Sequence, residues 1–67
     1  MIRLHIFVKG ARRGGAYVKA VPRVGDEVRL GGAGHEEYFV VKRLVWCLDE
    51  QRADGDGRVN MELEAAP

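Results

Sequence analysis

At 67 residues, with eleven Lys and Arg against ten Asp and Glu, the chain has room for one small domain and carries a net charge of +1. Its single cysteine, Cys47, excludes an internal disulfide, and His5, His35 and Cys47 lack the paired spacing of zinc sites, so neither a metal nor a cofactor is expected. The chain has no serine or threonine, which removes the usual hydroxyl nucleophiles and argues against an enzyme.

The first predicted strand covers residues 2–9, where apolar and polar residues alternate with the period of two typical of half-buried strands. One face consists of Ile2, Leu4, Ile6 and Val8, and the other of Arg3, His5, Phe7 and Lys9. The glycine-rich segment GARRGG (10–15) is predicted to close a hairpin into a second strand, AYVKAV (16–21). Placing Lys9 opposite Tyr17, and hence Val8 opposite Val18, gives this hairpin one continuous apolar face.

A proline-glycine segment separates the second strand from the third. In PRVGD (22–26), Pro22 cannot donate a ladder hydrogen bond and therefore suits the end of the second strand, while the Gly-Asp pair supplies a turn. The third predicted strand is EVRL (27–30), which points its valine and leucine inward. The segment GGAGHEE (31–37) then connects it to the fourth.

The fourth apolar segment, YFVVKRLVWCLDE (38–50), is too long for one flat strand in so small a protein. Both of its faces are apolar except at Lys42 and Arg43, which predicts a bulge or sharp bend there. Cys47 is interpreted as an inert core cysteine. Trp46 is also interpreted as core, with a position in a groove between loops as the alternative.

The last predicted strand, 58–65, again alternates cleanly, with Val59, Met61, Leu63 and Ala65 on one face. The connection QRADGDG (51–57) precedes it. Its Asp-Gly pairs indicate a hairpin turn, because the spacing does not fit a calcium-binding loop.

Five strands, one of them strongly bent, predict a single all-β domain over residues 1–67, a five-stranded antiparallel small barrel. An open antiparallel sheet that dimerises through an edge is the alternative architecture.

The order PRVGDEVRL, then YFVVKRLVW, then a turn and a short closing strand resembles SH3-like and KOW-like domains. In those domains a Gly-Asp pair opens a strand and a bent strand follows. The similarity covers Pro22 to Leu63 and implies an SH3-like barrel, and the chain also resembles small uncharacterised bacterial proteins with no assigned activity. An ALYDY-type segment and a second tryptophan are missing, so polyproline recognition is not expected.

The candidate binding surface is the outward face of the first hairpin. It comprises Arg3, His5, Phe7, Lys9, Arg12, Arg13, Tyr17 and Lys19. We expect a non-catalytic binding or adaptor module that makes a protein contact or self-associates through this face. The alternative is single-stranded nucleic acid, because aromatic side chains among cations stack on bases and meet phosphates. Residues 1–29 carry seven basic and two acidic side chains, which weakly favours an anionic partner, although the net charge of +1 argues against a dedicated nucleic-acid binder.

The most apolar N-terminal run, MIRLHIFVK, is interrupted by three basic side chains and is too short for a signal peptide or a membrane span. Together with the single cysteine, this favours a reducing cytoplasm, and no membrane partner is expected.

Overall fold

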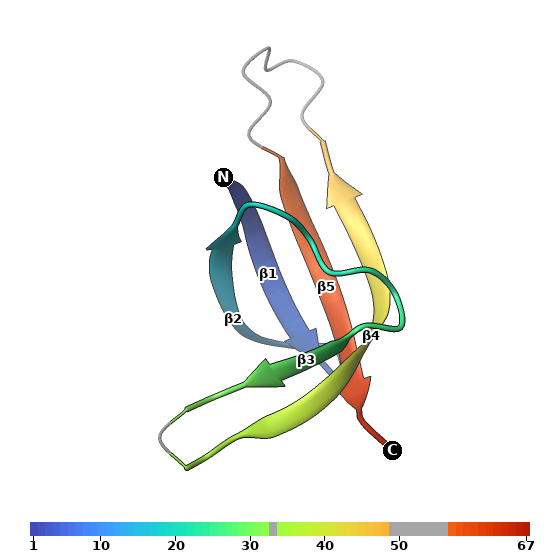
Figure 1. The fold of residues 1–67 in the computed structure, drawn as a ribbon. Helices are drawn as coiled ribbons and strands as arrows, with labels where there is room; N and C mark the ends of the chain where they lie inside the picture. The colour runs from blue at the N-terminus through green and yellow to red at the C-terminus, as the bar shows by residue number, and fades with distance from the viewer. Residues whose placement is uncertain (33, 49–56) are drawn as a thin grey trace.

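The computed structural model describes residues 1–32, 34–48 and 57–67, which form five strands and no helix (Figure 1). The strands are β1 (Ile2–Val8), β2 (Ala11–Val18), β3 (Glu27–Leu30), β4 (Glu37–Cys47) and β5 (Arg58–Ala65). The prediction of an all-β, five-stranded chain is confirmed. In the described part of the chain there is accordingly no helix of a length and hydrophobicity that could cross a membrane.

All five strands belong to one sheet with the order β2-β1-β5-β4-β3. The first and last strands, β1 and β5, pair in parallel, whereas every other pair is antiparallel. The predicted antiparallel sheet is therefore wrong at its centre. β5 inserts between β1 and β4, which sends β2 and β3 to opposite edges of the sheet.

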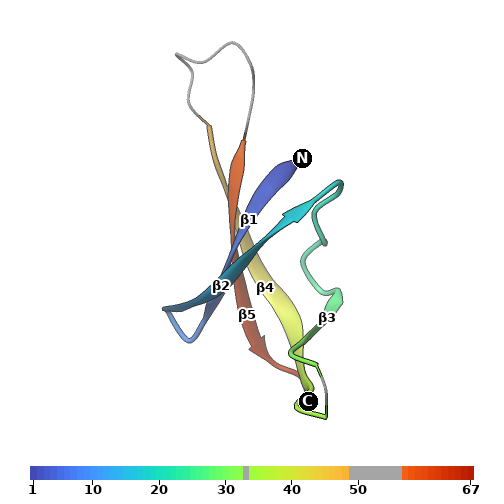
Figure 2. The ribbon, with the colours of Figure 1, turned by 90° about the vertical axis from the view of Figure 1, so that its left-hand side faces the viewer.

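The sheet curls into a half-barrel that stays open between its edge strands, so the predicted closed barrel does not form (Figures 1 and 2). The connection 19–26 crosses the concave side of the sheet on its way from β2 to β3. Val21 in this connection and Val28 in β3 pack against the core. The open side is thus partly covered by the chain itself.

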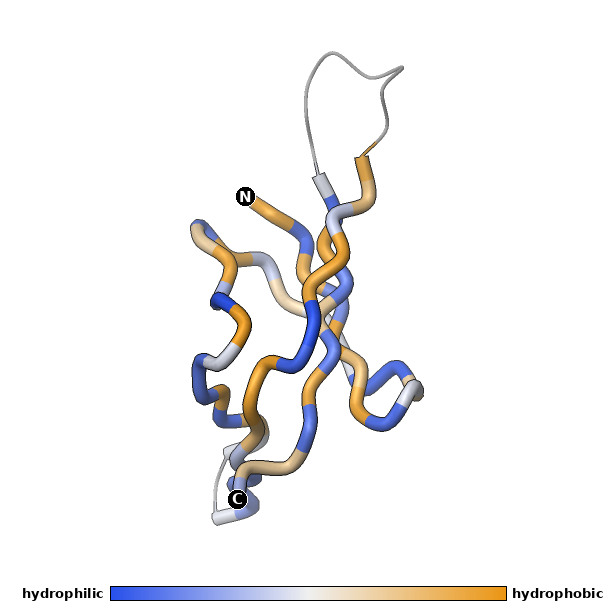
Figure 3. Tube along the Cα trace, turned by 90° about the vertical axis from the view of Figure 1, so that its right-hand side faces the viewer, coloured by the Kyte–Doolittle hydropathy of each residue, from blue (hydrophilic) through white to orange (hydrophobic). Residues whose placement is uncertain are grey.

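The core lies on the concave face and comes mainly from the three central strands. Its buried side chains are Leu4, Ile6, Phe39, Val41, Val59, Met61 and Leu63. Along β5 and along β1 as far as Ile6 these residues alternate with polar ones, and Figure 3 colours the chain by hydropathy. The predicted inward faces of both strands are confirmed.

The β1–β2 hairpin is tighter than predicted. Its two turn residues, Lys9 and Gly10, have φ of 51° and 78°, as a type I′ turn requires. The register pairs Arg3 with Tyr17, so the predicted pairing of Lys9 with Tyr17 is wrong. Most of the segment 10–15 belongs to β2 and not to a loop, because a two-residue turn already reverses the chain.

Two bulges bend the sheet. In β4 the register shift leaves Lys42 without a partner on β5, which confirms the predicted bend at Lys42 and Arg43. In β2, Arg13 has no partner on β1, where the register shifts between Ile6 and Phe7. The second bulge was not predicted, and it decides which arginine of β2 faces which side of the sheet.

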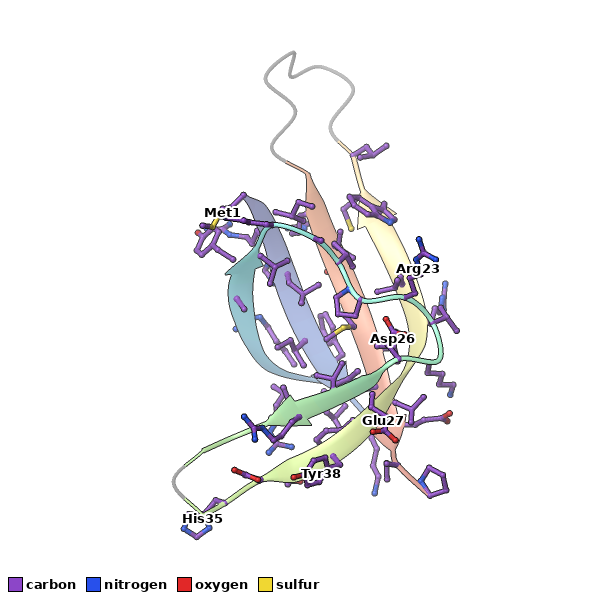
Figure 4. All side chains as sticks on the ribbon, viewed as in Figure 1. Met1, Arg23, Asp26, Glu27, His35 and Tyr38 are labelled. Carbon is purple, nitrogen blue, oxygen red and sulfur yellow. The ribbon has the colours of Figure 1, made fainter. Side chains whose placement is uncertain are left out.

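The predicted turn before β3 is present (Figure 4). The Asp26 N–H donates to the Arg23 carbonyl at 3.0 Å, and Gly25 between them has φ 95°, as in a type II turn. The Asp26 carboxylate accepts from the Arg23 N–H at 2.8 Å. Gly25 and Asp26 then exchange two 2.9 Å hydrogen bonds with Val41, which extends the β3–β4 ladder to the bulge. Pro22 lies in the connection and not at a strand end, because β2 ends well before it.

The core prediction is wrong for Trp46 and Cys47. Trp46 lies opposite Val59, on the concave face, but at the end of the sheet, where 51% of it is exposed. Cys47 lies opposite Arg58 on the other face and is partly exposed. The turn predicted at 54–57 lies outside the described residues except for its last glycine.

Candidate functional site

A cluster of basic side chains occupies the convex face of the sheet where β2, β1 and β5 lie side by side. Along β1, Arg3 has Tyr17 and Arg58 as its neighbours on the adjacent strands. Beyond the bulge, Arg12 pairs with Phe7 and so returns to this same face. We call Arg3, His5, Arg12, Tyr17 and Arg58 the convex cluster.

Two hydrogen-bonded pairs organise the convex cluster. The guanidinium of Arg3 donates to the Tyr17 hydroxyl from Nη2 at 3.0 Å and from Nε at 3.3 Å, and its Cζ lies 5.7 Å from the centre of the ring. Arg12 Nε donates to His5 Nδ1 at 3.4 Å. Since both contacts use only part of each guanidinium, donors remain for a ligand.

A hollow of about 370 Å³ lies against the β2 side of the convex cluster. It is lined by Arg3, Leu4, His5, Arg12, Gly15, Ala16 and Tyr17. Gly15 lies opposite His5, and a Cβ at Gly15 would come within 3.1 Å of the Leu4 carbonyl oxygen and 3.4 Å of Arg12 Nη2. The absence of a side chain at Gly15 therefore leaves room for the Arg12 guanidinium.

His5 is surrounded by cations. Burial lowers the pKa of His5 below its usual value, and the nearby charges of Arg12, Arg58 and Arg3 lower it further. In the neutral ring Nδ1 accepts the hydrogen bond from Arg12, so the proton is on Nε2. Nε2 is enclosed and has no hydrogen-bond partner.

The convex cluster has no carboxylate of its own. Within residues 1–32, 34–48 and 57–67, the ion pairs are formed by arginines outside the convex cluster, namely Arg13, Arg29 and Arg43. The next acidic residue on the same face, Glu62, lies beside Phe7 and approaches Arg43 to 3.9 Å. Among the described residues, the convex cluster is therefore a local excess of positive charge.

Of the eight predicted site residues, four converge in the convex cluster: Arg3, His5, Arg12 and Tyr17. Phe7 lies beside them on the same face and is half-buried. Lys9 is in the hairpin turn, and Lys19 lies beyond the end of β2.

Arg13, also predicted for this surface, points elsewhere. As the bulge residue it reaches β4, where its guanidinium forms an ion pair with Glu37 and lies 5.8 Å from the centre of the Phe39 ring. Phe39 is part of the core. Arg13 thus connects edge strand β2 to β4 across the open side of the half-barrel, and we call this contact the Arg13 clasp.

Arg58 was missed by the sequence reasoning. The alternation in 58–65 does place it on the outward face, but its position beside Arg3 depends on the parallel pairing of β1 and β5. No local pattern in the sequence carries that pairing, because the two strands lie at opposite ends of the chain.

The side chains of the convex cluster can bind a ligand in two ways. Guanidinium groups donate to oxyanions, and an exposed tyrosine ring offers a stacking surface. Elsewhere in the described residues, no three His, Cys, Asp or Glu side chains are grouped so as to hold a metal ion. Comparison with protein-family models, with curated proteins and with solved structures finds no match to this chain.

Proposed function

We propose that this protein is a non-catalytic binding module that binds single-stranded nucleic acid on the convex face of β2, β1 and β5. The observation that carries this proposal is the convex cluster. It combines three arginines that form no ion pair within the described chain with Tyr17, a residue that is 64% exposed. Arginine and exposed aromatic rings together are the combination that binds a phosphate backbone and its bases.

The roles divide between two kinds of side chain. Arg3, Arg12 and Arg58 contact phosphates, and Tyr17 stacks on a base beside the Arg3 guanidinium. Three adjacent strands span about 10 Å, so each protein chain contacts a short stretch of the ligand. We also propose that the fold is related to SH3-like domains. The Gly-Asp turn before the short β3 and the bulge in β4 support this relationship.

The test is fluorescence anisotropy of a labelled oligothymidine of about eight nucleotides, titrated with the protein at several salt concentrations. Three phosphate contacts predict that the logarithm of the affinity falls with the logarithm of salt with a slope of about −2. No anisotropy change at millimolar protein, or binding that ignores salt, contradicts the proposal.

Self-association is the second candidate, and the free edge of β2 favours it. β2 pairs only with β1, and among the described residues no strand covers its outer edge. A second copy of the chain can add a strand there, because an uncovered edge presents unpaired N–H and C=O groups. Sedimentation equilibrium tests this: a mass equal to the 7.5 kDa of one chain at all working concentrations removes it.

A further inference from the structure

We propose that protonation of His5 converts the Arg12–His5 contact into a pair of donors that binds one oxygen of a phosphate group. The inference deepens the proposed function, since it assigns a phosphate contact and its regulation to the same face. It predicts that the protein binds its anionic ligand more tightly as the pH falls.

The geometry of the contact suggests the switch. Arg12 Nε donates to His5 Nδ1 at 3.4 Å. This hydrogen bond occupies the Nε–H group of Arg12 and the lone pair on Nδ1. When Nδ1 takes up a proton it becomes a donor like Arg12 Nε, and the hydrogen bond between them is lost. An oxyanion placed between the two N–H groups accepts from both, and charge-assisted hydrogen bonds of this kind are the strong ones.

The charges around His5 determine the direction of the effect. Arg3 lies on β1, the same strand as His5. Arg12 and Tyr17 lie beside His5 on β2, and Arg58 lies near it on β5. Glu62 is the nearest acidic residue along this face of β5, and it is shared with Arg43 at 3.9 Å.

In the free protein these cations and the burial of the ring lower the pKa of His5, so the imidazole is neutral near neutral pH. A bound oxyanion offsets the cations and raises the pKa of His5. By linkage, a ligand that favours the protonated form binds more tightly where that form is populated.

The space for an anion is already present. The hollow of about 370 Å³ has Arg3, His5 and Arg12 in its wall, with Gly15 between them. A tetrahedral oxyanion needs far less volume than this, so a nucleotide phosphate can enter with part of its sugar outside.

The experiment follows both imidazoles by NMR as the pH is lowered from about 7.5 to about 5.5, with and without ligand. Sulfate and oligothymidine are the probes, because neither changes its own charge over this range. His35 is the internal control, since it is exposed at the tip of the β3–β4 connection and is not part of the convex cluster (Figure 4).

We expect the ligand to raise the titration midpoint of His5 by about one pH unit, which corresponds to binding about fivefold tighter at about pH 5.5 than at about pH 7.5 and to a limit of about tenfold at still lower pH. The midpoint of His35 should stay unchanged. His5→Gln keeps an acceptor for Arg12 but does not titrate, so it should bind with little pH dependence. His35→Gln should keep the full pH dependence.

The outcomes separate the switch from the proposed function. If oligothymidine binds equally at both pH values and the His5 midpoint stays constant, the switch is wrong and the proposed function stands. If sulfate raises the His5 midpoint but oligothymidine does not bind, the switch holds and the proposed function fails. Should neither probe bind at either pH, both are overturned.

Discussion

The arginines of this sheet fall into two groups with different surroundings. Arg13, Arg29 and Arg43 each lie within ion-pair distance of a glutamate, on the bulge of β2, on β3 and on β4. The arginines of the convex cluster lie around a histidine instead, and none has a carboxylate partner within the described chain.

Strand order produces this difference. In the first group, the β3–β4 hairpin holds Arg29 beside Glu36. Arg13 reaches from β2 to Glu37 of β4, and the antiparallel pairing of β4 with β5 places Arg43 beside Glu62. The parallel pairing of β1 with β5 brings Arg58 beside Arg3, two cations from opposite ends of the chain. An exposed ion pair contributes little to stability and is already neutralised, whereas a group of unpaired cations retains its charge for a ligand.

The largest expected effect distinguishes the two groups by charge reversal. Arg12→Glu and Arg29→Glu both change the net charge from +1 to −1. Arg12→Glu should weaken oligothymidine binding at least about tenfold, because it removes a charge-assisted contact and adds repulsion. Arg29→Glu should change the affinity by no more than about twofold, since Arg29 already has Glu36 at 3.5 Å. Anisotropy titrations at one salt concentration measure both variants.

The control for this comparison is the fold, checked by far-UV circular dichroism of both variants. Equal losses of affinity in the two variants would mean that only total charge matters. In that case the convex cluster is not a site.

Local alternation in the sequence was enough to predict much of the sheet. It predicted the inward faces of β1, β3 and β5, and the two charges inside an apolar run predicted the bulge at Lys42. The parallel pairing of β1 and β5 was not predictable in this way, because side-chain period carries no information on which strands become neighbours.

Part of the candidate site was predicted in spite of a wrong hairpin register. The predicted partner of Tyr17 was Lys9 and the observed one is Arg3, an even displacement that keeps the same side chains on the same face. The bulge then separates Arg12 from Arg13, placing Arg12 on the convex face and Arg13 in the clasp. A one-residue irregularity in a glycine-rich strand has no signal in the alternation.

A smaller effect, on stability, is expected for the Arg13 clasp. Arg13→Ala removes the ion pair with Glu37 and the contact with the Phe39 ring, and should cost about 1 kcal/mol. For a domain of this size that lowers the melting temperature by about 4–8 °C. Arg43→Ala is the matched variant, because its 3.9 Å pair with Glu62 is exposed and should cost at most about 0.5 kcal/mol. Thermal unfolding of both shows whether the clasp stabilises the open side; equal melting temperatures would show that it does not.

The smallest expected effect is the pH dependence of stability in the free protein. Because the pKa of His5 is lowered by folding, the unfolded chain binds a proton at this residue more readily than the folded chain. The resulting stability is present above about pH 6.5 and is lost as the pH falls from there through the lower pKa of the folded state. Thermal unfolding between about pH 7.5 and about pH 5.5 should therefore show a smaller fall in melting temperature for His5→Gln than for the wild type.

His35→Gln provides the comparison for this last effect, because it removes an exposed histidine and leaves the convex cluster intact. Its melting temperature should follow that of the wild type across the same range. Sulfate should reduce the acid loss in the wild type, since an anion at the convex cluster offsets Arg3, Arg12 and Arg58 and stabilises protonated His5. If wild type and His5→Gln instead lose stability in parallel, the three arginines do not lower the pKa of His5. The two groups of arginines would then differ only in whether they form ion pairs.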